Sequence, residues 1–411
     1  MQFIELPLHK SIQKAVAEAR FQRPTLVQEK TIPLVLAKKN VIVAAQTGTG
    51  KTAAFALPIL DLLFDKQDAE KGGKTIKALV VTPTRELAIQ ILENFKSYSK
   101  YSNLRTTAVF GGVSLEPQKE VLAKGVDILV ATPGRLIDLQ LQGNIDLSHL
   151  EIFVLDEADL MLDMGFINDV KKIEQSTPKK KQTLLFSATI PDKIDELAKS
   201  VIKNAVKVQI NPEETTAKNI GQLLYYLPKK NKTDLCLHLL RNTINGKIII
   251  FRRTKFGVDK LEQTLLKNGY KATSIHGDKS QGIRNKAIED FKSKSATILI
   301  ATDVAARGID ITNVDAIINF DIPNIAETYV HRIGRTGRAG KSGIAFSFCS
   351  PDENSYIKSI EDLLKKSIKV IDDHPYPINK PKHKKKQPNT VSKHKKSRKS
   401  AASKKKKKRW Y

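Results

Sequence analysis

The alternation of apolar and polar stretches along the chain predicts two successive α/β domains. Short runs rich in β-branched residues alternate with longer stretches of helix-like spacing. The runs are 41–45, 78–84, 106–110, 127–132, 152–156 and 183–189, followed by 222–227, 247–251, 273–277, 296–302, 315–321 and 343–350. Strands that alternate with helices form parallel sheets, because the helix carries the chain back for the next strand. Each set of six runs is therefore expected to form one parallel sheet.

The polar stretch 209–219 shows neither a strand period nor a helix period, and it is the expected linker. We therefore expect a first domain over residues 1–208 and a second over residues 220–373. Residues 374–411 are expected to form a disordered Lys-rich tail. Each predicted domain is long enough to fold around its own core.

The charge distribution indicates a polyanionic partner. The chain carries a formal net charge of +27, and residues 378–411 alone contain 16 Lys or Arg and no Asp or Glu. Such a block cannot bury enough apolar surface to fold, and it favours nucleic acid through counterion release. A tail that only improves solubility remains the alternative.

Membrane, disulfide and zinc functions are not expected. No apolar run approaches the ~18 residues of a membrane-spanning helix, and the N-terminus lacks the pattern of a signal peptide, so we expect a cytoplasmic location. Cys236 and Cys349 are the only cysteines, far apart and without a His cluster. We expect both to be buried small hydrophobes in a reducing compartment.

A glycine-rich turn, residues 45–52, follows the first apolar run and reads AQTGTGKT. This is the spacing of a P-loop, with alanine at the first glycine position. Gly48 and Gly50 would let backbone amides approach phosphate oxygens, while Lys51 would bind the β- and γ-phosphates and Thr52 a Mg²⁺ ion. By itself the turn is equally compatible with a plain strand-to-helix connection.

An acidic pair supports the phosphate interpretation. Asp156 ends an apolar run, and Glu157 follows it. In an open parallel sheet the carboxyl ends of the strands share one edge, where ligands bind. Asp156 could therefore hold the Mg²⁺ beside the P-loop, and Glu157 could orient or deprotonate an attacking water. The alternative, an N-cap followed by an acidic first turn, leaves the P-loop unexplained.

Residues 156–159 read Asp-Glu-Ala-Asp, and here the chain resembles the DEAD-box ATP-dependent RNA helicases. Further motifs follow in the order of that family from about residue 3 to residue 370. The segments FRRTKFG, HGDKSQGIR and IEDLLKKSI are most similar to the bacterial RhlE-like subgroup. The resemblance implies two tandem RecA-like parallel-sheet domains joined by a short linker.

The resemblance also implies an ATP site completed by both domains. Gln28 and Phe21 of FQRPTLVQ would read and stack on the adenine, and Asp303 would reach the ribose. The remaining ATP contacts would be Ala45, Gln46, Thr47, Gly48, Thr49, Gly50, Lys51 and Thr52, with Mg²⁺ held by Thr52 and Asp156, partly through water. The catalytic set would be Lys51, Asp156, Glu157 and two arginine fingers on the γ-phosphoryl group, Arg335 and Arg338. The alternative for the cations of HRIGRTGR (331–338) is a solvated surface patch, and the pair of arginine fingers is the preferred interpretation.

RNA contacts and coupling residues are implied in the same way. The segments PTRELA, TPGR, FRRT and ATDVAARGID match strand-binding motifs of the family, although Arg252 stands where the family often has a small apolar residue. The implied RNA contacts are Arg85, Gly111, Gly112, Thr132, Gly134, Arg135, Thr254, Gly277, Gln281, Arg284 and Arg307. The implied coupling residues are Asp159, Ser187, Thr189 and His331.

The expected function is therefore that of an RNA-dependent ATPase and RNA helicase that uses ATP and Mg²⁺. Closure on single-stranded RNA or a short duplex would open base pairs locally and remodel RNA–protein complexes, with a ribosomal precursor or an RNA-degradation complex as partner. Two alternatives stay open. One is a double-stranded DNA translocase or repair helicase on the same plan, and the other is an RNA-binding or annealing protein without ATPase activity.

Overall fold

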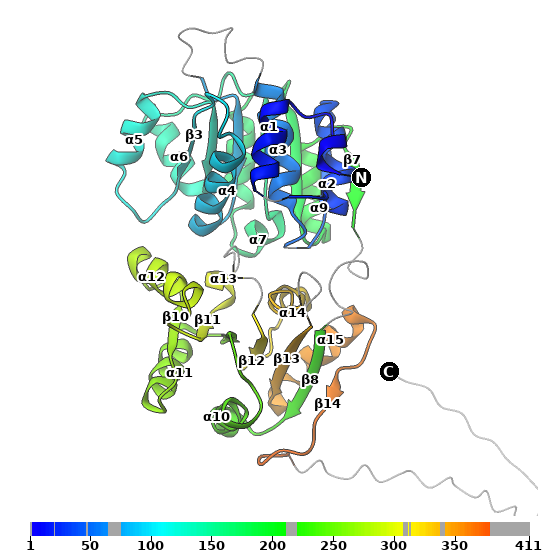
Figure 1. The fold of residues 1–411 in the computed structure, drawn as a ribbon, viewed down its shortest axis with the longest axis vertical. Helices are drawn as coiled ribbons and strands as arrows, with labels where there is room; N and C mark the ends of the chain where they lie inside the picture. Colours follow the sequence, from blue (N-terminus) through cyan, green and yellow to red (C-terminus); the bar gives the residue numbers. More distant parts are fainter. Residues whose placement is uncertain are drawn as a thin grey trace, which may run out of the picture. The chain divides into compact units, whose positions relative to one another are not determined.

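The computed structural model describes residues 2–19, 21–46, 48–64, 75–210, 220–306, 311, 314–337 and 342–378. Its tertiary contacts divide the chain into a unit of residues 1–377, which contains all the secondary structure of the described residues, and a unit of residues 378–411. The larger unit contains two seven-stranded sheets (Figure 1). The predicted fold, two successive parallel α/β domains, is confirmed.

The first sheet has the strand order β3-β4-β2-β5-β6-β1-β7, and all its described pairs are parallel. Its strands are β1 (Val41–Ala44), β2 (Ala78–Val81), β3 (Thr106–Val109), β4 (Ile128–Ala131), β5 (Ile152–Leu155), β6 (Gln182–Ser187) and β7 (Val206–Gln209). The helices around it are η1 (Phe3–Glu5), α1 (Lys10–Glu18), α2 (Leu26–Leu36), α3 (Lys51–Phe64), α4 (Arg85–Tyr98), α5 (Glu116–Ala123), α6 (Pro133–Leu141), α7 (Ala158–Asp163), α8 (Ile167–Gln175) and α9 (Asp192–Val201).

The second sheet repeats this topology strand for strand, with the order β10-β11-β9-β12-β13-β8-β14. Its strands are β8 (Ile220–Tyr226), β9 (Ile248–Phe251), β10 (Ala272–Ile275), β11 (Ile298–Ala301), β12 (Ala316–Asn319), β13 (Gly343–Cys349) and β14 (Lys369–Val370). Its helices are η4 (Lys229–Asn231), α10 (Lys232–Asn242), α11 (Lys255–Lys267), α12 (Gln281–Lys292), α13 (Asp303–Ala306), α14 (Ala326–Ile333), η5 (Pro351–Glu353) and α15 (Asn354–Leu364).

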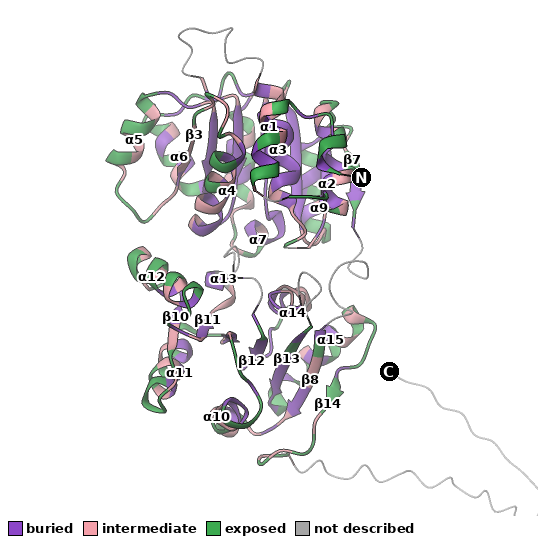
Figure 2. Cartoon of the chain, in the orientation of Figure 1, coloured by how far each residue is buried: buried purple, intermediate pink, exposed green. Residues whose placement is uncertain are grey.

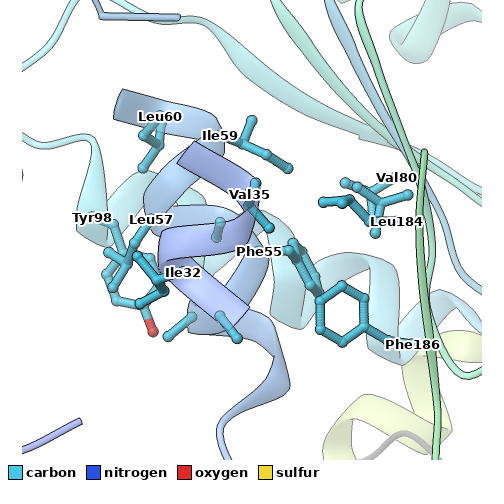
Figure 3. Close-up of a cluster of buried hydrophobic side chains, with 14 of the residues drawn as sticks. Ile32, Val35, Phe55, Leu57, Ile59, Leu60, Val80, Tyr98, Leu184 and Phe186 are labelled. Atoms are coloured by element: carbon cyan, nitrogen blue, oxygen red, sulfur yellow. The ribbon is translucent and has the colours of Figure 1, made fainter. Parts of the chain in front are cut away.

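Both faces of each sheet are buried, as Figure 2 shows by colour. In the first sheet alternate residues of one strand enter different cores: Val80 lies in the core with α1, α2, α3 and α4, and Leu79 lies in the core with α6, α8 and α9. Figure 3 shows part of the first of these cores, where Phe55 and Phe186 pack with ring centroids 5.2 Å apart. Burial on two faces explains why the strands read as continuous apolar runs.

The pattern of apolar runs missed one edge strand in each sheet. β7 pairs with β1, and the two-residue β14 pairs with β8. Most β7 residues and both β14 residues are exposed. Edge strands with exposed faces lack the run of apolar residues that marked the other strands. β7 ends at Gln209, and the rest of the expected linker, except Ile210, lies outside the described residues.

The described part of the chain also bears on two simpler expectations. Cys236 and Cys349 are both buried and unpaired, and burial raises the pKa of each thiol to about 12, so both remain protonated. None of the described helices has the length and apolar character needed to cross a bilayer. Nearly all of the basic tail falls outside the described residues.

Candidate nucleotide and RNA site

The glycine-rich turn lies where the motif requires it, between the end of β1 and the start of α3. Gly48 and Gly50 both adopt positive φ angles, +86° and +89°, which side-chain-bearing residues rarely adopt. Gly50 is also constrained by space, because a Cβ atom there would lie 2.4 Å from Nε2 of Gln28. The turn can therefore direct backbone amides and the N-terminus of α3 at an anion.

Gln28 connects segment 21–28, predicted to contact adenine, to this turn. Its Oε1 accepts a hydrogen bond from the Thr25 amide at 2.9 Å, and its Nε2 donates to the Gly50 carbonyl at 3.1 Å. Thr25 adds a bond from its hydroxyl to the Thr49 carbonyl at 2.7 Å. Gln28 is therefore a buried brace of the P-loop. Phe21, in contrast, is 38% exposed beside Phe3 and Tyr98, so its ring is open to a flat ligand.

The predicted catalytic acids surround Lys51. The Lys51 Nζ forms an ion pair with Oε1 of Glu157 at 2.8 Å. Burial opposes the ammonium charge, but Glu157, Asp156 and Asp159 outweigh burial and raise the pKa of Lys51. Glu157 has a φ angle of 54°, a left-handed conformation for a residue with a side chain. Strained backbone of this kind persists where the surrounding structure holds it, often at functional sites.

Asp156 lies in an unfavourable environment for a carboxylate. It is 3% exposed, and its Oδ1 has no hydrogen-bond partner among the described residues. Burial and the neighbouring charge of Glu157 raise its pKa to about 7, although Lys51 acts in the opposite direction. An unpartnered carboxylate oxygen at the end of a strand is chemically suited to a divalent cation. Asp156 and the half-buried Thr52 therefore fit the magnesium site that the sequence predicts.

The structure brings three of the predicted coupling residues together. The Asp159 amide donates to Oγ of Ser187 at 3.1 Å, and Oδ2 of Asp159 accepts bonds from the Thr189 amide and hydroxyl at 3.0 and 3.1 Å. Burial raises the pKa of the Asp159 carboxyl, but His331, Lys51 and these bonds lower it more. His331 belongs to the second sheet's domain, so its charge acts on an acid of the first.

Three arginines converge on a cavity that is lined by the predicted RNA-binding segments. Its volume is about 330 Å³, and its lining includes Arg85, Arg135 and Arg284. Nε and Nη1 of Arg135 and Nε of Arg284 are buried without a hydrogen-bond partner among the described residues. Burial, Arg284 and Arg135 together lower the pKa of Arg85. Guanidinium nitrogens that lack a hydrogen-bond partner and line a cavity are typical of an anion site.

Four further predicted RNA residues line the same cavity, and Thr254 is not among its lining residues. Its lining also includes Gly111, Thr132, Gly134 and Gly277. Gly112 lies against Arg85, whose Nη1 donates to the Gly112 carbonyl at 3.4 Å. A Cβ at Gly112 would lie 1.9 Å from the Arg85 guanidinium, and its φ angle is +72°, so this position requires glycine. Thr254 caps α11, its hydroxyl oxygen accepting from the Gly257 amide at 3.1 Å.

No role for Glu86 was predicted from the sequence. An acidic residue directly after Arg85, in a predicted RNA-binding segment, could have indicated an ion pair with another arginine of the site. Oε1 of Glu86 forms an ion pair with Nη2 of Arg284 at 2.9 Å and accepts a bond from Nε2 of Gln281 at 2.9 Å. Gln281 and Arg284, predicted as RNA contacts, thus also link α12 to α4. Met164 and Phe166, which were likewise not predicted, add an apolar part to the lining of the cavity.

Arg332 is a further residue whose role was not predicted. Its guanidinium binds both carboxylate oxygens of Asp303, at 2.6 and 2.7 Å, and donates to the Asp321 carbonyl at 2.7 Å. Asp303, predicted to reach the ribose, is therefore held in a fixed orientation. The buried Arg335 lines the same small pocket as Asp303 and His331. Thr47, Arg307 and Arg338 lie outside the described residues.

Two family models match the chain, one in each of its two α/β domains. The family models "DEAD/DEAH box helicase" and "Helicase conserved C-terminal domain" match residues 25–197 and 231–340. The chain is 42% identical over 370 residues to the DEAD-box ATP-dependent RNA helicase RhpA of Helicobacter pylori, covering 90% of this chain and 74% of that protein. It is 44% identical over 366 residues to CshA of Geobacillus kaustophilus, covering 89% and 77%.

Two solved structures match both domains. Dbp5 of S. cerevisiae bound to RNA and ADP BeF3 is 32% identical, with a TM-score of 0.81 over 90% of this chain and 95% of that one. Mss116 bound to ssRNA and UDP-BeF is 31% identical, with a TM-score of 0.82 over 91% and 79%. The curated relatives are named RhpA and CshA, so these matches support the family, and the RhlE-like subgroup stays a prediction.

Proposed function

The chain belongs to the DEAD-box family of ATP-dependent RNA helicases. We propose that RNA-stimulated ATP hydrolysis drives closure and reopening of a cleft between its two domains. Closure on RNA would bend one strand and open a short duplex locally. The observation that carries the RNA part is the cavity where Arg85, Arg135 and Arg284 converge with unsatisfied guanidinium nitrogens.

On the nucleotide side, the contacts suggest an exchange of partners. Phosphate oxygens that bind Lys51 would replace Glu157 in its 2.8 Å ion pair, which releases the Glu157 carboxylate to orient and deprotonate a water molecule. Mg²⁺, held by Asp156 and Thr52, would neutralise charge on the phosphates. Lys51 and the arginine fingers Arg335 and Arg338 would then stabilise the charge that develops on the γ-phosphoryl group.

On the RNA side, charge placement supports backbone recognition. Guanidinium groups bind phosphate oxygens through paired N–H donors, and their cavity also presents glycine backbone at Gly111, Gly134 and Gly277. Such contacts are independent of base identity. The family relatives Dbp5 and Mss116 were solved with RNA or ssRNA bound, which agrees with this assignment.

Two measurements test the proposal. ATP hydrolysis should rise strongly with single-stranded RNA and much less with DNA of the same sequence, because 2′-hydroxyl groups distinguish the two. Fluorescence energy transfer between dyes on the two domains should increase when RNA and a non-hydrolysable ATP analogue are added together. Equal stimulation by DNA would favour a DNA translocase, and unchanged energy transfer would rule out the closure step.

The basic tail bears on the cellular role of the chain. A basic tail suits an enzyme that meets large structured RNAs, so we propose that the chain acts in ribosome assembly or RNA decay. Crosslinking and sequencing of bound RNA in cells, with the full-length chain and with residues 378–411 deleted, tests this role. Enrichment of ribosomal precursors or of decay intermediates would support it, and binding spread evenly over cellular RNA would contradict it.

A further inference from the structure

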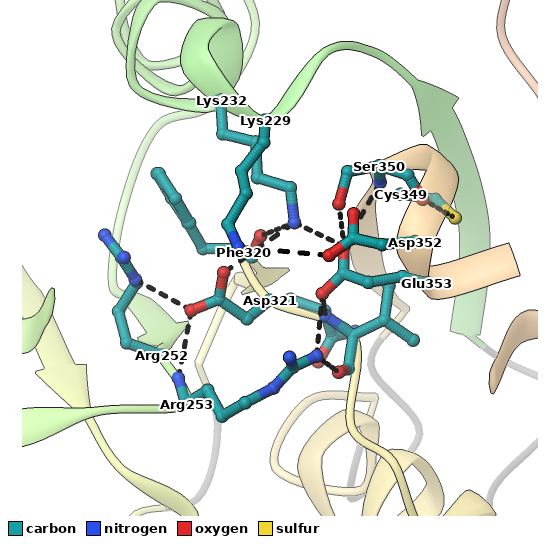
Figure 4. Close-up of polar contacts among 12 residues, drawn as sticks. Lys229, Lys232, Arg252, Arg253, Phe320, Asp321, Cys349, Ser350, Asp352 and Glu353 are labelled. Atoms are coloured by element: carbon teal, nitrogen blue, oxygen red, sulfur yellow. Dashed lines mark hydrogen bonds and ion pairs between the residues drawn. The ribbon is translucent and has the colours of Figure 1, made fainter.

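Five charged residues of the second domain form a network around segment 252–254, which is predicted to contact RNA (Figure 4). They are Lys232, Arg252, Arg253, Asp321 and Glu353. The arginines follow β9, Asp321 follows β12, Glu353 ends η5 after β13, and Lys232 begins α10. Strands β9, β12 and β13 are neighbours in the sheet. Neither Lys232 nor Glu353 belongs to any motif that the sequence analysis identified.

Glu353 is the most heavily used acceptor of this network. It is 2% exposed, and its Oε2 accepts bonds from Lys232 at 2.5 Å and from the amide and hydroxyl of Ser350 at 3.1 and 2.8 Å. Its Oε1 accepts bonds from the Ile322 amide at 3.1 Å and from Nη2 of Arg253 at 2.8 Å. One carboxylate therefore joins the chain after β13, the chain after β12 and the side chain of Arg253.

Lys232 completes the buried pair from the other side. It is 1% exposed, and besides Glu353 its ammonium group donates to the Phe320 carbonyl at 2.9 Å and lies 3.7 Å from Asp321. Burial of two opposite charges costs desolvation free energy, and a buried pair of apolar residues of similar size would cost less. What the charges provide is directional contacts to three backbone segments.

The segment after β9 is held by contacts of Arg252 and Arg253. Oδ2 of Asp321 accepts bonds from Nε of Arg252 at 2.9 Å and from the Arg253 amide at 3.0 Å. The Arg252 guanidinium lies over the Phe320 ring at 4.1 Å, which explains how an arginine is accommodated at a position where the family often has a small residue. Arg253 reaches Glu353 and the Ile322 carbonyl, so neither arginine is free to move independently of the network.

We propose that Glu353, supported by Lys232, is a positioning residue for RNA binding. By holding Arg253 it fixes the backbone of residues 252–254, and with it the hydroxyl of Thr254 and the first turn of α11. This inference rests on the proposed contact between Thr254 and the RNA backbone.

The charge of Glu353 makes the inference distinguishable from simple electrostatics. Replacement of a carboxylate by a neutral amide makes the domain more positive, and bulk electrostatics would then strengthen RNA binding. The positioning role predicts the opposite sign. A purely structural role would instead lower stability and affect ATP and RNA kinetics together.

The test compares the full-length E353Q and R253Q variants with wild type in steady-state RNA-stimulated ATPase assays. The RNA concentration for half-maximal stimulation should rise about tenfold in each, the factor one charge-assisted hydrogen bond is worth. kcat at saturating RNA and KM for ATP should stay within about twofold. R253Q alters a half-exposed side chain and leaves the buried pair in place. Because it also removes a positive charge, its weaker binding supports the inference only if the salt slope of RNA binding is unchanged.

D315N is the matched control. Asp315 accepts a bond from the Lys247 amide at 2.7 Å at the opposite end of β9, so this variant removes the same charge from a carboxylate that, like Glu353, accepts a backbone amide, and it leaves Arg253 unaltered. It should leave RNA stimulation unchanged. Unchanged RNA affinity in E353Q and R253Q, or equal weakening in D315N, would overturn the inference. A salt slope of RNA binding lower by about 0.7 in R253Q would show a direct phosphate contact instead.

T254A separates this inference from the proposed function. Weaker RNA binding in T254A with no change in E353Q and R253Q overturns the positioning role alone. Unchanged RNA binding in T254A overturns the assignment of Thr254 itself, and the positioning role with it.

Discussion

Replacement of Asp156 by asparagine should stabilise the protein while it abolishes ATP hydrolysis. Asp156 is buried, has an unpartnered Oδ1 and lies beside Glu157, and its pKa is raised to about 7. The folded chain therefore keeps the proton up to about pH 7, whereas the unfolded chain releases it near the ordinary value of 3.8. Stability contributed by this group falls as pH rises through that interval.

The size of the effect follows from the two pKa values. An increase from 3.8 to about 7 corresponds to about 4 kcal/mol of unfolding free energy at a pH above both, at 1.36 kcal/mol per pKa unit. Relaxation of the site and the coupling to Glu157 and Lys51 reduce what a variant can recover. We expect D156N to gain about 1–3 kcal/mol at pH 8 and little at pH 4. For a domain of this size each kcal/mol raises Tm by about 2–4 °C.

The assay is thermal unfolding of the full-length chain, followed by calorimetry between pH 4 and pH 8 in buffer with EDTA and no nucleotide. D159N is the matched control three residues away. The pKa of Asp159 is lowered, since His331, Lys51 and its hydrogen bonds outweigh burial, so its carboxylate adds stability above the unfolded pKa. D159N should therefore be less stable than wild type at pH 8, the opposite sign to D156N.

A second measurement connects stability to function. MgATP should raise the Tm of the wild type by mass action and leave D156N nearly unchanged, since that variant lacks the carboxylate proposed to hold Mg²⁺. A buried carboxylate kept to bind a cation lowers the stability of the free protein, which is a common trade-off between stability and activity. If D156N is no more stable than wild type at pH 8, or if its advantage is equal at pH 4 and pH 8, the reasoning about Asp156 is refuted.

Three further predictions concern the nucleotide site and the tail. R335Q should lower RNA-stimulated kcat by a factor of about 10³ or more with little change in KM for ATP, and rapid-quench kinetics would show whether the hydrolysis step is the one slowed. Q28A should raise KM for ATP about tenfold, since it removes the bond between Gln28 and the Gly50 carbonyl; titration with a fluorescent ATP analogue checks this, and unchanged affinity would contradict the brace. Deletion of residues 378–411 should flatten the salt dependence of RNA binding, whose slope should be near −6 if about half of the 16 cations contact phosphates. Filter binding at several salt concentrations measures the slope, and an identical slope in the truncated chain would leave the tail as a solubilising segment.

Short-range patterns predicted most of the fold. Most of the twelve recognised strands are buried on both faces and are apolar at nearly every position, a signature that can be read without knowledge of partners. The edge strands β3 and β10 were recognised although they are only partly buried. β7 and β14 were missed because edge strands with exposed residues carry no such signature. Strand order itself is not local, and the identical order of the two sheets appears only once the pairs are formed.

The chemistry of the site divides in the same way. The sequence alone determined which groups are available: a glycine-rich turn ending in Lys51, the acids at 156 and 157, and the cations of 331–338. Spacing constrains these because a turn and the end of a strand are local structures. It also determined the concentration of positive charge in the last 34 residues, which depends on composition only.

Only the tertiary structure decided which of these groups contact each other and how they shift each other's pKa. Burial beside Glu157 raises the pKa of Asp156 to about 7, and contacts between distant segments place Gln28 against the P-loop, Glu86 against Arg284 and Glu353 against Arg253. These effects depend on desolvation and on distances between residues far apart in the chain. No local pattern encodes either quantity, since both exist only after the sheets have formed.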